Sequence, residues 1–291
     1  MTGVQTCALP ICGAPTGVLK EAAMNLVLGI LPDFTPEQRD AAIEAGARAM
    51  NAEGITAVKD PGIVLKEWES YQRVHARDAL SVRVFVLWRS PDNIEDAEAL
   101  VQRVQPFTRP YVSSGDDRLI SGGIKVFADG SGGARTAWMH EDWNKEFDGI
   151  DTGNKGFPAL PSDVLERQIN LYHDAGLHIG VHVIGDRAID FVVDTYSTML
   201  EKTPTKGLRH SLIHCNIPTE HALDVMARLQ RDYDAAYPEI QSTFTWWIGD
   251  TYAGNFGPER GQSLKPLASF VERGIRFGAG SDYNVTPYAP R

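Results

Sequence analysis

One repeating pattern limits the folds open to this sequence. A helix ends at a glycine, an apolar strand follows, and a polar residue closes the strand. His173–Gly176 leads into a strand over His178–Val183, and Glu272–Gly274 leads into a strand over Ile275–Gly280. Alternating strands and helices predict a parallel sheet that is covered by helices. Amphipathic helices are predicted between such strands, for example over Asp163–Ala175, Arg187–Leu200 and Glu220–Leu229.

The same reading predicts seven strands in all. They span Ile55–Lys59, Val82–Trp88, Ile124–Ala128, His178–Val183, Leu212–His214, Ile240–Phe244 and Ile275–Gly280. A doubly wound α/β sheet is one alternative. An incomplete (β/α)8 TIM barrel that lacks its first strand accounts better for the long loop Asp129–Leu160, which follows the carboxyl end of a strand, where such barrels build active sites.

Composition excludes several classes of partner. The chain has 28 basic and 38 acidic residues, a net charge of -10, which argues against nucleic acid or an anionic membrane as a partner. No apolar run approaches the roughly 20 residues of a membrane span. Cys215 is the only cysteine after residue 12, so we expect a reducing, cytoplasmic location and no zinc site built on cysteines.

The first residues are unusual. Met1–Ile11, MTGVQTCALPI, matches the translation of a sequencing-library adapter, and it lacks the basic region and cleavage site of a signal peptide. We therefore interpret residues 1–12 as non-native and expect the barrel domain to occupy residues 13–291. On this interpretation the gene fragment was cut at its start.

A lysine stands inside the strand of the segment Gly122–Thr136, GGIKVFADGSGGART. Alternation places Ile124, Val126 and Ala128 on one face and Lys125 on the other. A buried, unpaired ammonium is costly. Either a carboxylate such as Asp129 or Asp282 holds Lys125, or its pKa is lowered and the amine takes part in chemistry.

The same alternation places polar residues of three other strands on the inner face. His182, His214 and Asp282 each lie opposite the bulky aliphatic series of their strand. We therefore expect Lys125, His182, His214 and Asp282 to converge at one end of the barrel lumen. Imidazole and carboxylate ligands suit Zn²⁺. The alternatives are ordinary core histidines and a helix N-cap at Asp282.

Four motifs in order, GGIKVFADGSGGARTAWM, HVIGDRAID, RHSLIHC and GAGSDYNVTP, resemble the amidohydrolase superfamily. The most similar branch is amidohydrolase family 3, the YtcJ-like hydrolases that include N-substituted formamide deformylases. The resemblance implies a (β/α)8 barrel with a small β-sandwich domain. It also implies that the family's first strand with its His-x-His pair and part of the sandwich are missing from this chain, so we expect the fragment to be impaired.

The resemblance also implies roles for the four converging residues. Lys125 takes the place of a lysine that can be carboxylated and bridge two metal ions. His182 and His214 take the places of metal ligands, and Asp282 takes that of a ligand and proton shuttle. The implied cofactor is a divalent metal, zinc, as one or two ions.

The resulting expectation is a hydrolase of carbon–nitrogen bonds in amides, formamides or cyclic amides. The substrate pocket is expected to include Trp138, Trp143, Trp246, Trp247 and Asp129, with loop packing as the alternative for the tryptophans. The expected partner is a small-molecule substrate, and a homodimer is left open. Two rival functions remain: a non-catalytic binding barrel, and a Schiff-base lyase that uses Lys125.

Overall fold

The computed structural model describes residues 17–109, 115–146, 153–283 and 285–286. Its sheet has seven strands in the order of the chain, and each neighbouring pair is parallel. The strands are β1 (Ala57–Ile63), β2 (Arg83–Arg89), β3 (Leu119–Phe127), β4 (His178–Val183), β5 (Ser211–His214), β6 (Tyr237–Ile240) and β7 (Gly278–Ala279). Residues 1–12, which we interpret as non-native, lie outside the described residues.

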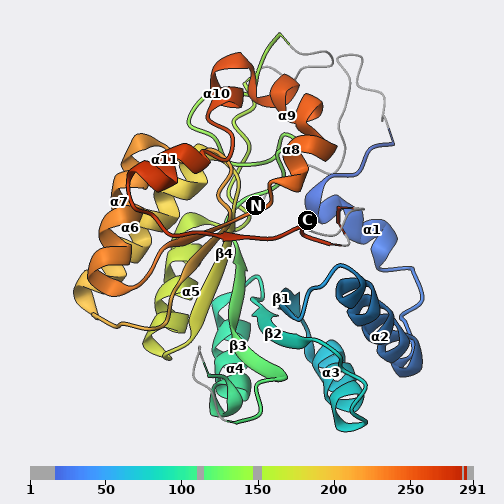
Figure 1. Cartoon of the computed structure of the whole chain (residues 1–291). Coiled ribbons are helices and arrows are strands. Elements are labelled where there is room, and N and C mark those ends of the chain that lie inside the picture. The colour runs from blue at the N-terminus through green and yellow to red at the C-terminus, as the bar shows by residue number, and fades with distance from the viewer. Residues whose placement is uncertain (1–16, 110–114, 147–152, 284, 287–291) are drawn as a thin grey trace.

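Helices connect successive strands, and Figure 1 shows α5, α6 and α7 side by side against the sheet. The helices are α1 (Asn25–Leu28), α2 (Pro36–Ala52), α3 (Leu65–Ala76), α4 (Ile94–Val104), α5 (Ser162–Asp174), α6 (Asp186–Lys202), α7 (Glu220–Tyr233), α8 (Thr243–Trp247), α9 (Gly249–Phe256), α10 (Pro258–Gln262) and α11 (Leu267–Glu272), with short 3-10 helices η1 (Glu21–Met24) and η2 (Gln105–Phe107). In the described part of the chain, no helix is long and apolar enough to cross a membrane.

The sheet is curled, because side chains of its first and sixth strands meet. Lys59 Nζ on β1 donates to Glu239 Oε1 on β6 at 2.5 Å, to His178 Nε2 on β4 at 3.1 Å and to Ser211 Oγ on β5 at 3.4 Å. His178 Nδ1–H in turn donates to the carbonyl of Leu208, which leaves its Nε2 as the acceptor. This inner face is the lumen of a (β/α) barrel, so the predicted fold class is confirmed.

The outer face of the sheet forms the main core. Ile179, Val181 and Val183 of β4 are fully buried there among the apolar residues of the helices. His178 and His182 lie on the opposite, inner face. The alternation predicted for this strand therefore matches its structure, and β4 has the predicted bounds.

Strand β3 begins at Leu119, whereas the prediction started it at Ile124. Two glycines explain the longer strand. A Cβ at Gly122 would lie 1.9 Å from the ring of Phe85 on β2, and one at Gly123 would lie 2.1 Å from a carbonyl oxygen of β4. Only residues without a side chain let the strand pass between these neighbours.

Two predicted strands were misplaced. The predicted strand Ile240–Phe244 is wrong, because β6 ends at Ile240 and Phe244 belongs to α8. Pro238 argues against a strand at this position, because proline has no N–H to donate. Here the missing N–H faces β7, and pairing between β6 and β7 starts only at Glu239, so no hydrogen bond is lost. The predicted strand over Ile275–Gly280 shrinks to Gly278–Ala279, since the Arg276 N–H donates to a side chain of α7 and not to β6.

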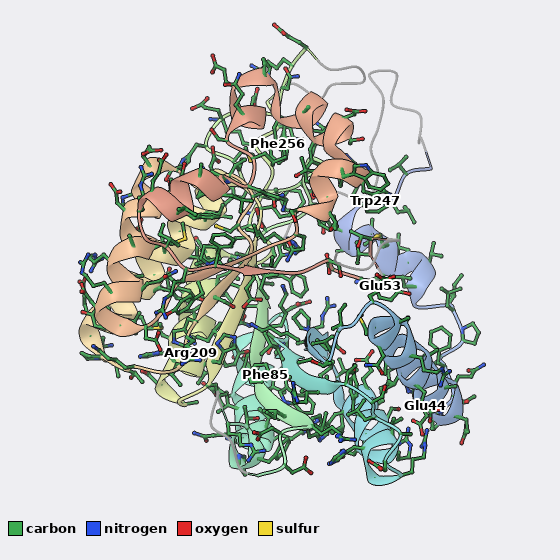
Figure 2. All side chains as sticks on the ribbon, viewed as in Figure 1. Glu44, Glu53, Phe85, Arg209, Trp247 and Phe256 are labelled. Atoms are coloured by element: carbon green, nitrogen blue, oxygen red, sulfur yellow. The ribbon has the colours of Figure 1, made fainter. Side chains whose placement is uncertain are left out.

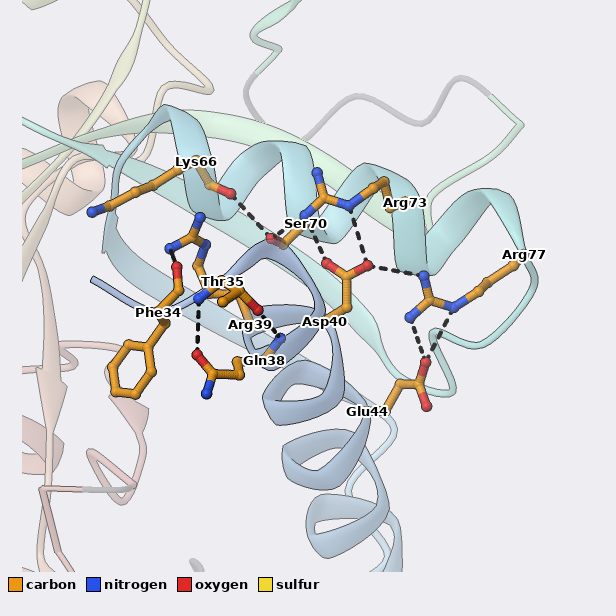
Figure 3. Close-up of polar contacts among 10 residues, drawn as sticks. All are labelled: Phe34, Thr35, Gln38, Arg39, Asp40, Glu44, Lys66, Ser70, Arg73 and Arg77. Atoms are coloured by element: carbon orange, nitrogen blue, oxygen red, sulfur yellow. Dashed lines mark hydrogen bonds and ion pairs between the residues drawn. The ribbon is translucent and has the colours of Figure 1, made fainter. Parts of the chain in front are cut away.

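Helix α2 begins with a capping box. Thr35 Oγ1 accepts from the Gln38 N–H at 3.2 Å, and the Thr35 N–H donates to Gln38 Oε1 at 2.9 Å (Figure 3). Farther along α2, Asp40 accepts hydrogen bonds from Arg73 on α3 and from Arg77, the residue that directly follows α3 (Figure 3). The hydrogen bonds from Arg73 chiefly lower the pKa of Asp40 to about 2. The ion pairs thus tie the first two long helices together.

Candidate active site

Two of the predicted residues lie side by side at the carboxyl ends of neighbouring strands. His182 is the next-to-last residue of β4 and His214 is the last residue of β5. The parallel register pairs Val183 with His214, and the two imidazole rings make a T-shaped contact with centroids 4.6 Å apart. Strand pairing therefore fixes the distance between the two rings.

Hydrogen bonds decide which nitrogen of each ring keeps a lone pair. His182 Nε2–H donates to the carbonyl oxygen of Gly130 at 2.9 Å, so Nδ1 is the lone-pair nitrogen of the neutral ring. His214 Nδ1–H donates to Gln241 Oε1 at 2.6 Å, which leaves the lone pair on Nε2. Burial lowers the pKa of His182 to about 3 and that of His214 well below its ordinary value. Both rings are therefore neutral, as metal ligation requires.

Lys125 is buried on the inner face of β3, with 3% of its surface exposed. Its Nζ lies 4.8 Å from the centroid of the Phe127 ring. Burial lowers the pKa of Lys125 to about 7, although the negative charges of Glu239 and Asp282 act in the opposite direction. Near neutral pH a substantial fraction of this amine is uncharged, and only an uncharged amine is a nucleophile.

Asp282 follows β7, and its backbone has a left-handed φ of 58°. Burial raises its pKa, while the charges of Lys125 and Lys265 act to lower it. The turn after it is held by another residue, since Ser281 Oγ accepts from the Tyr283 N–H at 3.1 Å and the Ser281 carbonyl accepts from the Thr286 hydroxyl at 2.8 Å. The described contacts therefore give no support to Asp282 as a helix N-cap.

Charge interactions connect the four predicted residues, but the structure does not gather them all into one ligand shell. The charge of Lys125 acts, after burial, to lower the pKa of both histidines. Within residues 17–109, 115–146, 153–283 and 285–286, no three His, Cys, Asp or Glu side chains are close enough together to hold a metal ion. The two neutral imidazoles are by their chemistry suited to metal ligation, as a pair. Asp282 also lines a cleft of about 1540 Å³ between β1 and β7.

The backbone around this site adopts unfavourable conformations. His214, Cys215, Lys265 and Asp282 have φ values of 78°, 42°, 51° and 58°. Non-glycine residues with positive φ are uncommon, and they cluster at functional sites because the surrounding structure must hold them there. Positive φ is not confined to this end of the sheet, since Arg209, Asp234 and Ala236 at the opposite end also have it.

The sequence profile of the amidohydrolase family matches residues 11–291. This chain belongs to the amidohydrolase family. Among relatives, YtcJ of Bacillus subtilis (strain 168) is 26% identical over 284 residues, covering 96% of this chain and 49% of that protein. N-substituted formamide deformylase of Arthrobacter pascens is 24% identical over 293 residues, covering 96% of this chain and 50% of that protein. The predicted family placement is confirmed.

Solved structures confirm the fold of this amidohydrolase chain. An uncharacterized metal-dependent hydrolase from Pyrococcus horikoshii OT3 superposes with a TM-score of 0.73 at 20% identity, over 95% of this chain and 51% of that one. Atrazine chlorohydrolase TrzN from Arthrobacter aurescens TC1, complexed with zinc, gives a TM-score of 0.51 at 14% identity, over 89% and 51% of the two chains. This chain spans about half the length of the curated relatives it matches.

Asp129, which is expected in the substrate pocket, binds backbone N–H groups in the structure. Its carboxylate accepts hydrogen bonds from the N–H groups of Trp138, Ile184 and Gly185 at 2.8–3.0 Å. Burial raises the pKa of Asp129 to about 7, and the three backbone donors act in the opposite direction. In this amidohydrolase, Asp129 ties the long loop after β3 to the end of β4.

The four tryptophans expected in the pocket have different surroundings. Trp138 packs against Phe191 of α6, with the guanidinium of Arg187 4.7 Å from its ring centroid. Trp143 is 1% exposed in a small loop core beside Phe256. These contacts favour the loop-packing alternative for both residues. Trp246 and Trp247 belong to α8 and are 73% and 40% exposed (Figure 2 shows Trp247).

Three polar residues of the lumen were not predicted. Glu239 was missed because the strand was predicted to begin at Ile240, one residue after it, and Gln241, which directly follows β6, was placed inside that predicted strand without a role. Lys59 was predicted only as the end of a strand, although a lysine in a buried strand is the signal that identified Lys125. Applied uniformly, that signal would have singled out Lys59 as well.

Proposed function

We propose that the protein represented by this chain is a metal-dependent hydrolase of carbon–nitrogen bonds in amides, formamides or cyclic amides. The contact between His182 and His214 carries the proposal. Both rings are neutral, each keeps one lone-pair nitrogen, and a hydrogen bond to a carbonyl or amide oxygen orients each ring. This is the arrangement that proteins use to prepare histidines for a metal.

In this proposal His182 and His214 hold a divalent cation, zinc, and Lys125, carboxylated or free, and Asp282 complete its surroundings. Such an ion supplies Lewis acidity toward the amide carbonyl and toward water. Asp282 accepts a proton as the water oxygen bonds to the carbonyl carbon, and it delivers that proton to the leaving nitrogen as the C–N bond breaks. Burial raises the pKa of Asp282, which makes its carboxylate a better proton acceptor than an exposed aspartate.

Metal binding by histidine variants tests the proposal. We expect zinc measured by equilibrium dialysis to fall in His182→Ala and His214→Ala, and hydrolysis of formamides and cyclic amides to be lost with it. His221→Ala is the matched control, because His221 lies on α7 in an exposed pair with Asp194. Zinc binding that is unchanged in both site variants would contradict a metal role for the pair.

One observation favours a second candidate, a Schiff-base lyase. The buried amine of Lys125, with its pKa near 7, is also suited to attack a carbonyl. Borohydride reduction in the presence of a carbonyl substrate would then attach the substrate carbon skeleton to Lys125, as read by peptide mass spectrometry. We expect no such adduct. A protein with neither activity would be the non-catalytic binding barrel.

A further inference from the structure

A second buried lysine lies beside the candidate site. Lys265 is 6% exposed, in the segment between α10 and α11. Its backbone N–H donates to the carbonyl of Asn216, and its Nζ donates to Asn216 Oδ1 at 2.7 Å. Asn216 follows His214 by two residues, so the lysine is fixed at the carboxyl end of β5.

The partner of this ammonium is neutral. Among the described residues, no carboxylate forms an ion pair with Lys265, and its one hydrogen bond from Nζ goes to the amide oxygen of Asn216. Burial lowers the pKa of Lys265 to about 8, so most of the amine is still charged at neutral pH. An ammonium has three N–H donors. A buried charge without an ion-pair partner costs stability, and binding of an anionic ligand is one reason for a protein to retain it.

One aromatic ring, that of Phe244, neighbours both the amine and His214. The Phe244 ring lies 5.6 Å from Lys265 Nζ, and the same ring stacks with His214 at a centroid distance of 6.1 Å. The charge of Lys265 also acts on the pKa of His214 and of Asp282. The amine is therefore within electrostatic reach of two residues that carry the proposed chemistry.

We propose that Lys265 is a specificity-determining residue that binds a carboxylate group of the substrate. In naming a substrate class this inference rests on the proposed function: the substrate is an amide, formamide or cyclic amide that carries a carboxylate. Asp282 acts on the amine through its charge but forms no described ion pair with it, so a substrate carboxylate can accept charge-assisted hydrogen bonds from the amine. Asn216 holds the amine in position for it.

Two matched ligands test the inference without requiring catalysis. N-formylglycine carries the carboxylate, and N-formylglycinamide replaces it with a neutral amide of nearly the same shape. In calorimetric titrations we expect the protein to bind the acid about 10- to 100-fold more tightly, as hydrogen bonds to charged groups predict. Lys265→Met should remove this preference and leave binding of the glycinamide unchanged. Lys206→Met, at an exposed lysine, is the control and should keep the preference.

A second variant guards against a folding artefact. Asn216→Asp keeps Lys265 and supplies an internal carboxylate at the present hydrogen-bond distance, so it should also remove the preference for the acid. Equal binding of the two ligands by the unaltered protein, or an undiminished preference in Lys265→Met, would overturn the inference. If the preference for the acid depends on Lys265 but no C–N bond is cleaved, the proposed function fails and the Lys265 site stands.

Discussion

At the scale of single residues, the candidate site depends on which atom carries a proton. Gly130 and Gln241 each accept a hydrogen bond from one histidine, and each thereby sets the lone pair of that ring. Neither residue was predicted to matter, because the identity of a hydrogen-bond acceptor depends on where strands β4, β5 and β6 end. The predicted histidines and their unpredicted acceptors therefore form one functional unit.

Gln241→Leu tests this unit. The substitution removes the acceptor of His214 Nδ1–H, so the ring loses its preferred tautomer and orientation. We expect zinc affinity to fall about 10- to 100-fold, the usual effect of removing such a partner. Gln105→Leu, at an exposed glutamine near α4, should leave zinc affinity unchanged. Equal zinc affinity in the two variants would mean that Gln241 does not orient a ligand.

Asp282→Asn separates a proton shuttle from a structural residue. We expect turnover of an active amide substrate to fall by roughly 10²–10⁴, with the melting temperature unchanged, because Ser281 holds the following turn. Ser281→Ala should show the reverse, losing about 1 kcal/mol of stability with the shuttle still present. Near-native turnover in the Asp282 variant would remove this residue from the mechanism.

At the scale of elements, a strand was predicted accurately where the local sequence marks its two ends. Strand β4 was predicted to the residue, because a glycine precedes it and three buried aliphatic residues alternate within it. Strands β3 and β6 were not, since Gly122 and Pro238 normally indicate that a strand has ended. Contacts with neighbouring strands allow Gly122 and Pro238 within a strand. Those contacts cannot be inferred from the local sequence.

The ion pairs between α2 and α3 make a prediction about acid stability. The pKa of Asp40 is lowered, chiefly by Arg73, so its contribution is fully present above pH 4 and is lost as the pH falls toward 2. We expect Asp40→Asn to lower the free energy of unfolding by about 1 kcal/mol at pH 7 and to weaken its pH dependence below pH 4. Denaturant unfolding is the measurement, and Glu69→Gln, at an exposed position of α3, is the control.

At the scale of the whole molecule, the interior contains histidines, among them His178 and His210, that are buried in the neutral form. His178 and His210 are fully buried, and burial holds the pKa of each well below the ordinary value. His210 Nε2–H donates to His173 Nδ1 at 3.0 Å, and its Nδ1 accepts from the backbone N–H of Ile179. These assignments leave no nitrogen of His210 available for a second proton.

The stability of the protein should therefore fall as the pH is lowered below about 6.5. The unfolded chain binds protons at His178 and His210 that the folded chain does not, and each site contributes up to about 1.4 kcal/mol per pH unit. Urea unfolding between pH 7.5 and 5.5 measures this slope, and His210→Gln should make it shallower. His221→Gln should make it steeper, because Asp194 raises the pKa of His221 and favours the folded state at low pH.

The order of the sheet has a consequence for how the protein is made. Each strand pairs with the strand that precedes it in the chain, from β1 to β7. During synthesis each new strand and helix can therefore dock on the strand that left the ribosome just before it. Pairing of the described strands does not require a partner that is distant in the sequence. The polar groups of the lumen come together only after Glu239 and Asp282, which follow most of the other lumen residues in the sequence, have been synthesised.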